Sequence, residues 1–85
     1  MIPMTMEAAR VNAGYTQEQA GKLFGVHPQT LARWEIDNSK MPYDMIQKIP
    51  DVYKVPANHI FFGNKNEFIR YLREGKFSRD KNEEM

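Results

Sequence analysis

Gln29, Thr30 and Arg33 are polar side chains in a segment whose apolar residues, Leu31 and Trp34, lie three positions apart. The apolar pair predicts the inner face of a helix, so the polar side chains point elsewhere, where no core group can accept them. A glutamine amide can form two hydrogen bonds with adenine N6 and N7, and an arginine guanidinium can do the same with guanine O6 and N7. The segment therefore has chemistry suited to reading base edges, and its alternative is a solvated helix face.

Residues for catalysis or metal binding are scarce. The only histidines, His27 and His59, stand far apart in the sequence, and Ser39 and Ser78 have no nucleophile elbow and no base nearby. The chain has no cysteine and no glycine-rich phosphate loop. We therefore expect that it is not an enzyme and that it holds no metal and no cofactor.

The composition is that of one small globular domain. The 85 residues are 41% hydrophobic and 27% charged, and 12 basic side chains nearly balance 11 acidic ones. No apolar run approaches the ~20 residues of a membrane span, and the first residues lack a basic start followed by an apolar block. We expect a cytoplasmic protein with no membrane partner. Its net charge of +1 does not identify a ligand.

Apolar periodicity predicts helices throughout the chain and no strands, hence an all-α fold. The first helix is expected over residues 5–13 and the second over 17–24. Thr16 and Gln19 form a capping pair that starts the second helix. Arg10 falls on the inner stripe of the first helix and must find a buried acceptor, because an unpaired buried charge is costly.

Start and stop signals place the remaining helices. We expect Leu23 on the buried side of the second helix, and Pro28 in the first turn of a third. A fourth helix is predicted over residues 43–49, with a break or kink at Pro50. A fifth is predicted over residues 55–62.

Residues 64–85 differ from the rest of the chain, because their apolar side chains stand among many charges. The apolar set is Phe68, Ile69, Tyr71 and Leu72. We predict a short amphipathic helix that closes at Gly75, followed by a mobile charged tail.

Between positions 16 and 35 the chain reads TQEQAGKLFGVHPQTLARWE. This is the pattern of two short helices joined at Gly25, with the small residues Ala20 and Gly21 where the helices approach closely. The segment resembles the helix-turn-helix of the phage Cro and repressor (Xre-like) family, and the resemblance covers residues 5–63. It implies a compact five-helix, lambda-repressor-like DNA-binding domain over residues 1–63, whose third helix enters the major groove while the second crosses the backbone.

The family's DNA contacts carry over to positions on and around the third helix. The resemblance implies base contacts from Gln29, Arg33, Pro28 and Thr30. It implies contacts with the DNA backbone from Gln17, His27, Asn38, Ser39, Lys40 and Arg10. It also pairs Arg10 with Glu35, which supplies the acceptor that burial of Arg10 requires.

Three positions depart from the family pattern. Ile36 and Asp37 stand where Asn-Gly is common, and Asp37 would repel a phosphate. His27 replaces the usual serine or threonine cap, which weakens the start of the third helix unless Pro28 compensates. Pro50 stands where a helix-compatible residue is common.

The resemblance implies a transcription regulator of the phage or prophage repressor or Cro type, encoded by a bacterium or a phage. One recognition helix reads only a few base pairs, so we expect a homodimer on a near-palindromic operator in double-stranded DNA. The candidates for a dimer surface, or else for completion of the core, are Ile60, Phe61, Phe62, Phe68 and Leu72.

Two other functions stay open at this point. An antitoxin uses the same DNA-binding domain with an added segment that grips its toxin, and residues 64–85 are candidates for that segment. A toxin or an anti-repressor protein would then be a further partner. A helix-turn-helix module that binds protein instead of DNA is compatible with a net charge near zero. The salt dependence of DNA affinity distinguishes a DNA-binding protein from this protein-binding module.

Overall fold

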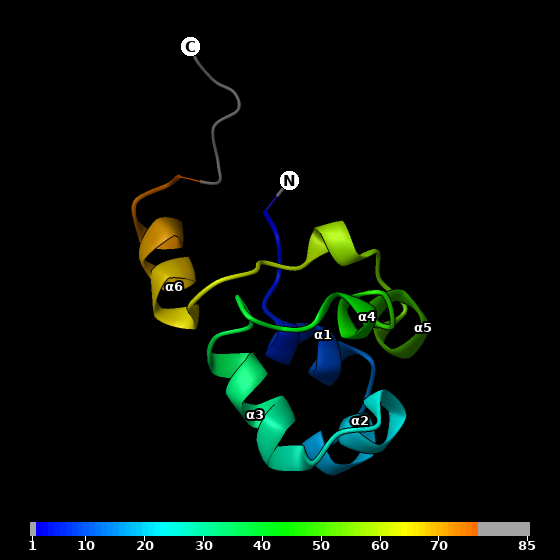
Figure 1. Cartoon of the computed structure of the whole chain (residues 1–85). Helices are drawn as coiled ribbons and strands as arrows, with labels where there is room; N and C mark the ends of the chain where they lie inside the picture. Colours follow the sequence, from blue (N-terminus) through cyan, green and yellow to red (C-terminus); the bar gives the residue numbers. More distant parts are fainter. Residues whose placement is uncertain (1, 77–85) are drawn as a thin grey trace.

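The computed structural model describes residues 2–76 as an all-α fold. Its elements are α1 (Met6–Asn12), α2 (Gln17–Phe24), α3 (Pro28–Ile36), α4 (Tyr43–Ile46), α5 (Ile49–Tyr53), the 3-10 turn η1 (Ala57–His59) and α6 (Lys65–Arg73) (Figure 1). None of the helices in the described range has the length and apolar character needed to cross a bilayer.

The core lies between α1, α2, α3 and α5. The four largest fully buried side chains, Met6, Phe24, Leu31 and Ile49, come one from each of these helices. Tyr53 meets the Phe24 ring edge-on, with 5.3 Å between the ring centroids. Each side chain of this kind stabilises the fold by about 1.5–3 kcal/mol when it leaves water. The helix carrying the candidate base contacts is thus anchored by its opposite face.

A close crossing fixes α2 against α3. Gly21 is buried, and a Cβ atom added to it would lie 2.9 Å from the backbone oxygen of Val26. Gly25 ends α2 with a φ of 80°, a left-handed conformation that side chains resist. The two glycines therefore allow a turn that no larger residue would permit without displacing backbone.

The start of α2 is capped as predicted. Thr16 accepts a hydrogen bond from the Gln19 amide at 3.1 Å, and the Gln19 side chain accepts one from the Thr16 amide at 2.9 Å. Leu23 differs from expectation, because half of its side chain is exposed. Ala20 and Phe24 fill the core on this helix and leave Leu23 turned outward.

The predicted helix over 43–49 is wrong in its extent. α4 ends at Ile46, the chain turns through Gln47 and Lys48, and α5 begins at Ile49. Pro50 does not kink a longer helix; it lies in the first turn of α5, where its missing N–H has no helical partner to lose.

The predicted helix over 55–62 is also wrong. Only η1 is helical there, and the chain then runs extended beside the N-terminal segment, where Met4 and Ile60 form a parallel bridge. The Met4 amide donates to the His59 oxygen and the Phe61 amide donates to the Met4 oxygen, each at 2.8 Å. Backbone hydrogen bonds to the distant N-terminal segment thus take the place of the helical hydrogen bonds that were expected within residues 55–62.

α6 is the predicted amphipathic helix, and it packs against α3. Phe68 is buried, with its ring centroid 5.0 Å from that of Phe61. A backbone bridge between Asp37 and Asn64 joins the start of α6 to the end of α3. Gly75 closes the segment with a φ of 72°. The predicted charged tail over residues 77–85 lies outside the described residues.

Candidate nucleic-acid interface

The outer face of α3 carries the predicted base-reading residues. Gln29 and Arg33 are exposed, whereas Leu31 of the same helix is fully buried. Pro28 and Thr30 are half-buried beside them. Because Gln29 and Arg33 are four residues apart, their side chains lie one above the other along the solvent face. No hydrogen bond within the described residues uses either of these two side chains, so both are available to a ligand.

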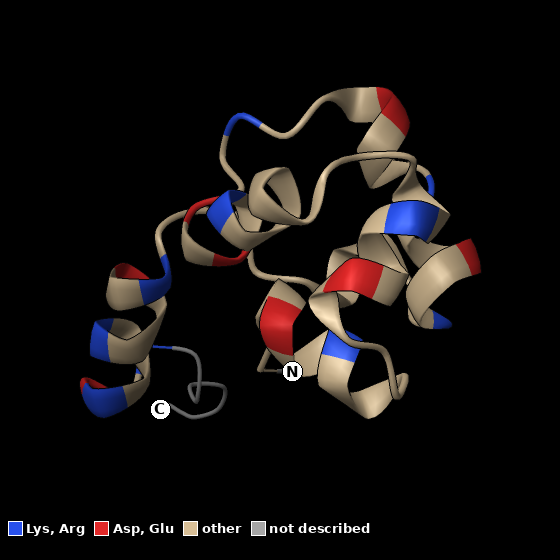
Figure 2. Cartoon of the chain, turned by 90° about the horizontal axis from the view of Figure 1, so that it is seen from below, with Lys and Arg blue, Asp and Glu red and all other residues tan. Residues whose placement is uncertain are grey.

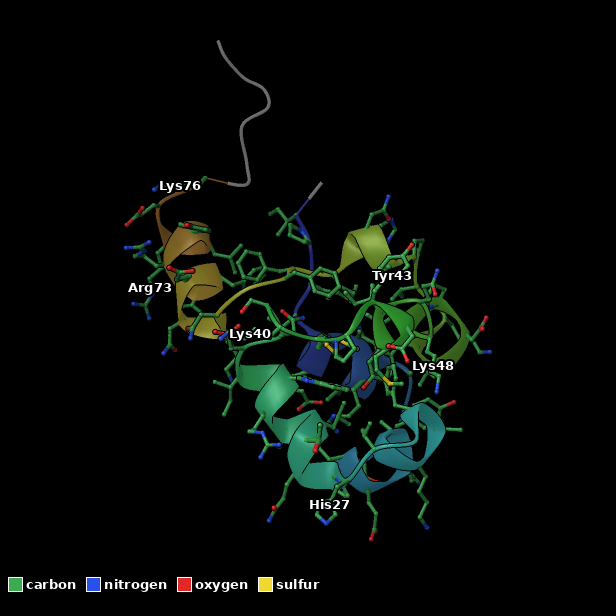
Figure 3. The ribbon with its side chains drawn as sticks, in the orientation of Figure 1. His27, Lys40, Tyr43, Lys48, Arg73 and Lys76 are labelled. Carbon is green, nitrogen blue, oxygen red and sulfur yellow. The ribbon has the colours of Figure 1, made fainter. Side chains whose placement is uncertain are left out.

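His27 caps α3 with its own ring. Its Nδ1 atom accepts a hydrogen bond from the Gln29 amide at 3.0 Å, and Pro28 follows in the first turn. The expectation that histidine weakens this helix start is therefore corrected, because an imidazole nitrogen replaces the usual hydroxyl oxygen. The ring is exposed at the tip of the molecule, where Nε2 is open to solvent (Figure 3).

A buried carboxylate ties α3 to α1 and α2. Glu35 is 6% exposed and receives Arg10 Nε on Oε2 at 2.6 Å and Gln17 Nε2 on Oε1 at 2.9 Å. Arg10 also donates from NH1 to the Tyr15 oxygen at 2.8 Å, in the turn before α2. The pair that the resemblance implied is present, and Gln17 joins it. The network fixes the N-terminus of α2 relative to the recognition helix.

This network leaves Arg10 poorly placed for a phosphate. The pKa of Arg10 is raised above its ordinary value, chiefly by the hydrogen bonds to Glu35, so the guanidinium stays charged. Its side chain is only 12% exposed and its donors are directed at Glu35 and Tyr15. The side chain acts inside the fold in the described structure, and its expected contact with the DNA backbone stays a prediction.

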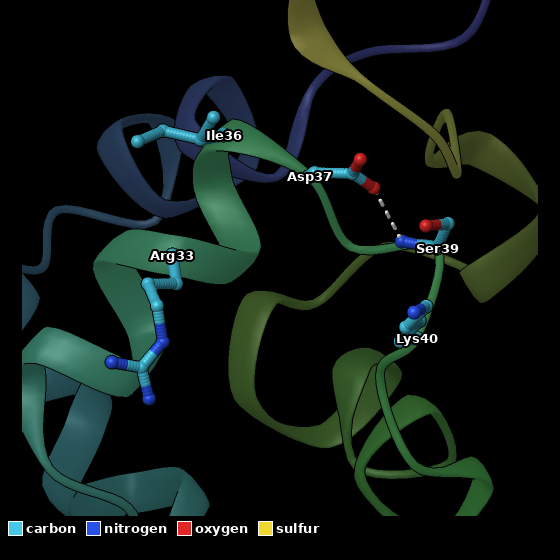
Figure 4. Close-up of a pocket in the computed structure, with 5 residues that line it drawn as sticks. All are labelled: Arg33, Ile36, Asp37, Ser39 and Lys40. Carbon is cyan, nitrogen blue, oxygen red and sulfur yellow. Dashed lines mark hydrogen bonds between the residues drawn. The ribbon is translucent and has the colours of Figure 1, made fainter.

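The chain after α3 forms a shallow groove of about 400 Å³ beside the outer face. It is lined by Arg33, Ile36, Asp37, Ser39 and Lys40 (Figure 4). Ser39 and Lys40 are exposed on its rim, as a contact with a backbone phosphate requires.

Asp37 is turned toward its own loop. Its carboxylate accepts a hydrogen bond from the Ser39 amide at 2.9 Å (Figure 4). The pKa of Asp37 is lowered, chiefly by hydrogen bonding from the side chain and backbone of Ser39. The carboxylate is therefore occupied in ordering the loop that presents Lys40.

Asn38 does not face a DNA backbone, which corrects its predicted role. The residue is 3% exposed, and its side chain donates to the Phe61 oxygen at 3.2 Å and accepts from the Gly63 amide at 2.8 Å. Asn38 thus fastens the chain ahead of α6 to the end of α3. Its sequence neighbours, two polar residues in a loop, gave no sign of this role.

The five candidates for a dimer surface separate into two groups. Ile60 and Phe68 are buried in the core, so of the two predicted alternatives they complete the core. Phe61 packs against Phe68 and Tyr71 within the domain. Phe62 and Leu72 are 37% and 40% exposed, and Ile69, which was not among the candidates, is 38% exposed.

Two internal features of the fold could not be predicted from the sequence. Lys48 donates from Nζ to the Phe24 oxygen at 3.1 Å and so binds the C-terminal end of α2, where helix carbonyls lack partners. The Tyr53 hydroxyl is buried without a hydrogen-bond partner in the described structure. Neither has a local sequence signal, because each depends on packing between helices.

Comparison with known proteins agrees with this geometry. The family model described as helix-turn-helix matches residues 6–60, well over half of the chain. The match begins with α1 and ends just after η1, so it contains α2, α3 and the loop that follows. No curated protein matches the chain.

Proposed function

The chain belongs to the Cro and repressor (Xre-like) helix-turn-helix family of DNA-binding regulators, and on that basis we propose that it represses transcription as a sequence-specific dimer. The proposed site is a near-palindromic operator in double-stranded DNA. Occupation of the operator blocks RNA polymerase. α3 reads bases in the major groove, and the N-terminus of α2 lies over the backbone.

The observation that supports this proposal most is the two-sided character of α3. Leu31 and Glu35 hold its inner face, by packing and by the buried ion pair, while Gln29 and Arg33 point outward with no partner in the described fold. A rigid helix with free bidentate side chains is what direct readout needs.

Each outward side chain has a defined chemical role. Arg33 donates two hydrogen bonds to guanine O6 and N7, and Gln29 pairs with adenine N6 and N7, each discriminating by about 1–3 kcal/mol. Thr30 contacts a base or a phosphate, and the Pro28 ring is apolar enough to meet a thymine methyl. These four residues supply the sequence preference.

The DNA backbone contacts lie on either side of α3. Gln17 opens α2, where unpaired amides and the helix dipole favour a phosphate oxygen. On the other side stand Ser39 and Lys40, and His27 lies at the helix tip with Nε2 free. Such contacts set the register of the protein without reading sequence.

Dimer formation is proposed through the exposed apolar side chains Phe62, Ile69 and Leu72, which lie on or next to α6. Two copies related by a two-fold axis would place their recognition helices one DNA turn apart, about 34 Å. The operator would then be an inverted repeat with half-site centres about ten base pairs apart.

Selection from a randomised duplex library tests the proposed function. At about 150 mM salt, where binding driven by charge alone is weak, we expect enrichment of an inverted repeat. Recovery of duplexes with no common sequence would reject the repressor and favour a module that binds protein.

A further inference from the structure

α6 presents a basic surface that the base-reading residues do not explain. Arg70 and Arg73 are exposed and three residues apart, so they are neighbours on one face of the helix. Glu67 and Glu74 are the acidic residues of this segment (Figure 2). The two arginines are therefore available to a partner that accepts positive charge.

Two other cations of this region are already paired. Lys65 contacts Glu7 at 3.4 Å, and Lys76 contacts Glu74 at 3.2 Å. Arg70 lies over the Tyr71 ring, 5.4 Å from its centroid, which holds the guanidinium without neutralising it. Arg73 forms no ion pair or hydrogen bond with any residue in the described range.

α6 lies next to the end of α3, the helix that carries the candidate base contacts. The bridge from Asp37 to Asn64 starts α6 where the recognition helix ends, and the two helices follow one another along one edge of the molecule (Figure 1). Arg73 projects from the outer side of α6, away from the rest of the domain (Figure 3). With a rise of about 1.5 Å per residue, α6 extends this edge by about 13 Å.

We propose that Arg70 and Arg73 bind phosphates of the DNA backbone next to the segment that α3 reads. This inference rests on the proposed function, because it extends the footprint on the same duplex. The ligand chemistry is the phosphodiester backbone, which the two guanidinium groups recognise whatever the base sequence. α6 thereby adds affinity and salt dependence while leaving base preference unchanged.

The test compares the parent with the double variant Arg70→Ala/Arg73→Ala on the selected operator duplex. Loss of two phosphate contacts lowers the slope of log affinity against log salt by about 1.8. Between 50 and 200 mM salt, the parent should therefore lose about ten-fold more affinity than the double variant. The ranking of single-base operator variants should stay the same.

Two control variants separate a phosphate contact from a change in overall charge. Lys54→Asn removes one positive charge at a left-handed position away from α3 and α6, and should leave the salt slope unchanged. Glu67→Gln removes a negative charge beside Arg70 and should tighten binding severalfold. Thermal unfolding of each variant should match the parent, because these side chains are exposed.

The outcomes distinguish the inference from the function on which it rests. Suppose that the parent selects an operator and that the double variant has the same affinity and salt slope as Lys54→Asn. That result would overturn the role of α6 and leave the proposed function standing. Weakened binding accompanied by dissociation of the dimer in sedimentation would also overturn it. A parent that binds no duplex would overturn both proposals.

Discussion

At the scale of single residues, Glu35 connects the fold to its DNA-binding surface. Its carboxylate accepts hydrogen bonds from Arg10 of α1 and Gln17 of α2, although it belongs to the recognition helix. Removing one partner of such a buried pair leaves the other charge without compensation. The orientation of α3 is therefore set by electrostatics inside the protein as well as by packing.

Glu35→Ala should lower the free energy of unfolding by about 3–5 kcal/mol, because Arg10 would stay charged and buried. Gln17→Ala removes only one hydrogen bond and should cost about 1 kcal/mol. Urea denaturation followed by circular dichroism measures both. Equal and small losses in the two variants would contradict the network.

Tyr53→Phe should stabilise the domain slightly at neutral pH, because it removes a buried hydroxyl with no partner in the described structure. Burial raises the pKa of Tyr53 above its ordinary value, with the nearby charge of Glu35 adding to the effect. The folded state thus resists ionisation of this group. The contribution of neutral Tyr53 to the free energy of unfolding is fully present below the unfolded pKa of about 10, and it is lost as the pH rises beyond that value.

The measurement is urea denaturation of parent and Tyr53→Phe at pH 7 and at pH 10.5. The advantage of the variant should grow at the higher pH, since the parent loses stability from Tyr53 ionisation there and the variant does not. An advantage that stays constant or shrinks would show that Tyr53 does not ionise differently in the two states.

The chemistry of a single side chain allowed some of its hydrogen-bond partners to be predicted from the sequence, but not all. The acceptor for Arg10 could be anticipated, because a charge on an inner stripe demands one. The role of Asn38 could not, since its partners Phe61 and Gly63 lie more than twenty positions away. Exposure of Gln29 and Arg33 follows from helix periodicity, but their contact with bases remains a prediction.

At the scale of elements, the junction of α2 and α3 is the most tightly specified part of the fold. The capping box of α2, its left-handed Gly25 and the imidazole cap of α3 are all local features. They set where each helix begins and ends. Gly21 then sets how closely α2 can approach the start of α3.

Gly21→Ala should destabilise the domain by about 1–3 kcal/mol, because the new methyl would meet the Val26 oxygen at 2.9 Å and backbone must move. Lys22→Ala, one position on and exposed, should change stability by less than about 0.5 kcal/mol. Thermal unfolding compares the two. A stable Gly21→Ala variant would mean that the crossing of α2 and α3 can relax.

Elements held by local signals were predicted well, and those held by distant contacts were not. Thr16 and Pro28 mark helix starts through their own hydrogen-bonding properties, so α2 and α3 begin where expected. After η1, the chain at Ile60 and Phe61 is extended because it pairs with Met4, and local helical propensity gives no sign of such pairing. Pro50 was predicted to break or kink the fourth helix, but the break falls before it, at Gln47 and Lys48, and Pro50 lies in the first turn of α5.

At the scale of the whole molecule, DNA binding depends on where charge lies and not on its total. The net charge is only +1, yet Arg33 and Lys40 lie on α3 and the loop after it, and Arg70 and Arg73 lie on α6, which packs against α3. The exposed apolar side chains of α6 lie beside them. The proposed dimer and DNA surfaces are thus adjacent on one small domain.

Leu72→Asp should weaken self-association by ten-fold or more, because a carboxylate at this position would be desolvated in an apolar interface. The domain should stay folded, since Leu72 is 40% exposed. Sedimentation equilibrium measures the dimer constant, and circular dichroism checks the fold. Unchanged dimerisation would place the interface elsewhere on the molecule.

In the proposed complex Arg33 reads a base while Lys40 contacts the DNA backbone, and parallel selections on the parent, Arg33→Ala and Lys40→Ala test both roles. We predict that Arg33→Ala loses preference at one base position in each half-site, by about 1–3 kcal/mol, with the other positions retained. Lys40→Ala should weaken binding to all sequences alike and lower the salt slope by about one. An Arg33→Ala variant that selects the parent's operator with undiminished preference at every position would show that Arg33 does not read a base.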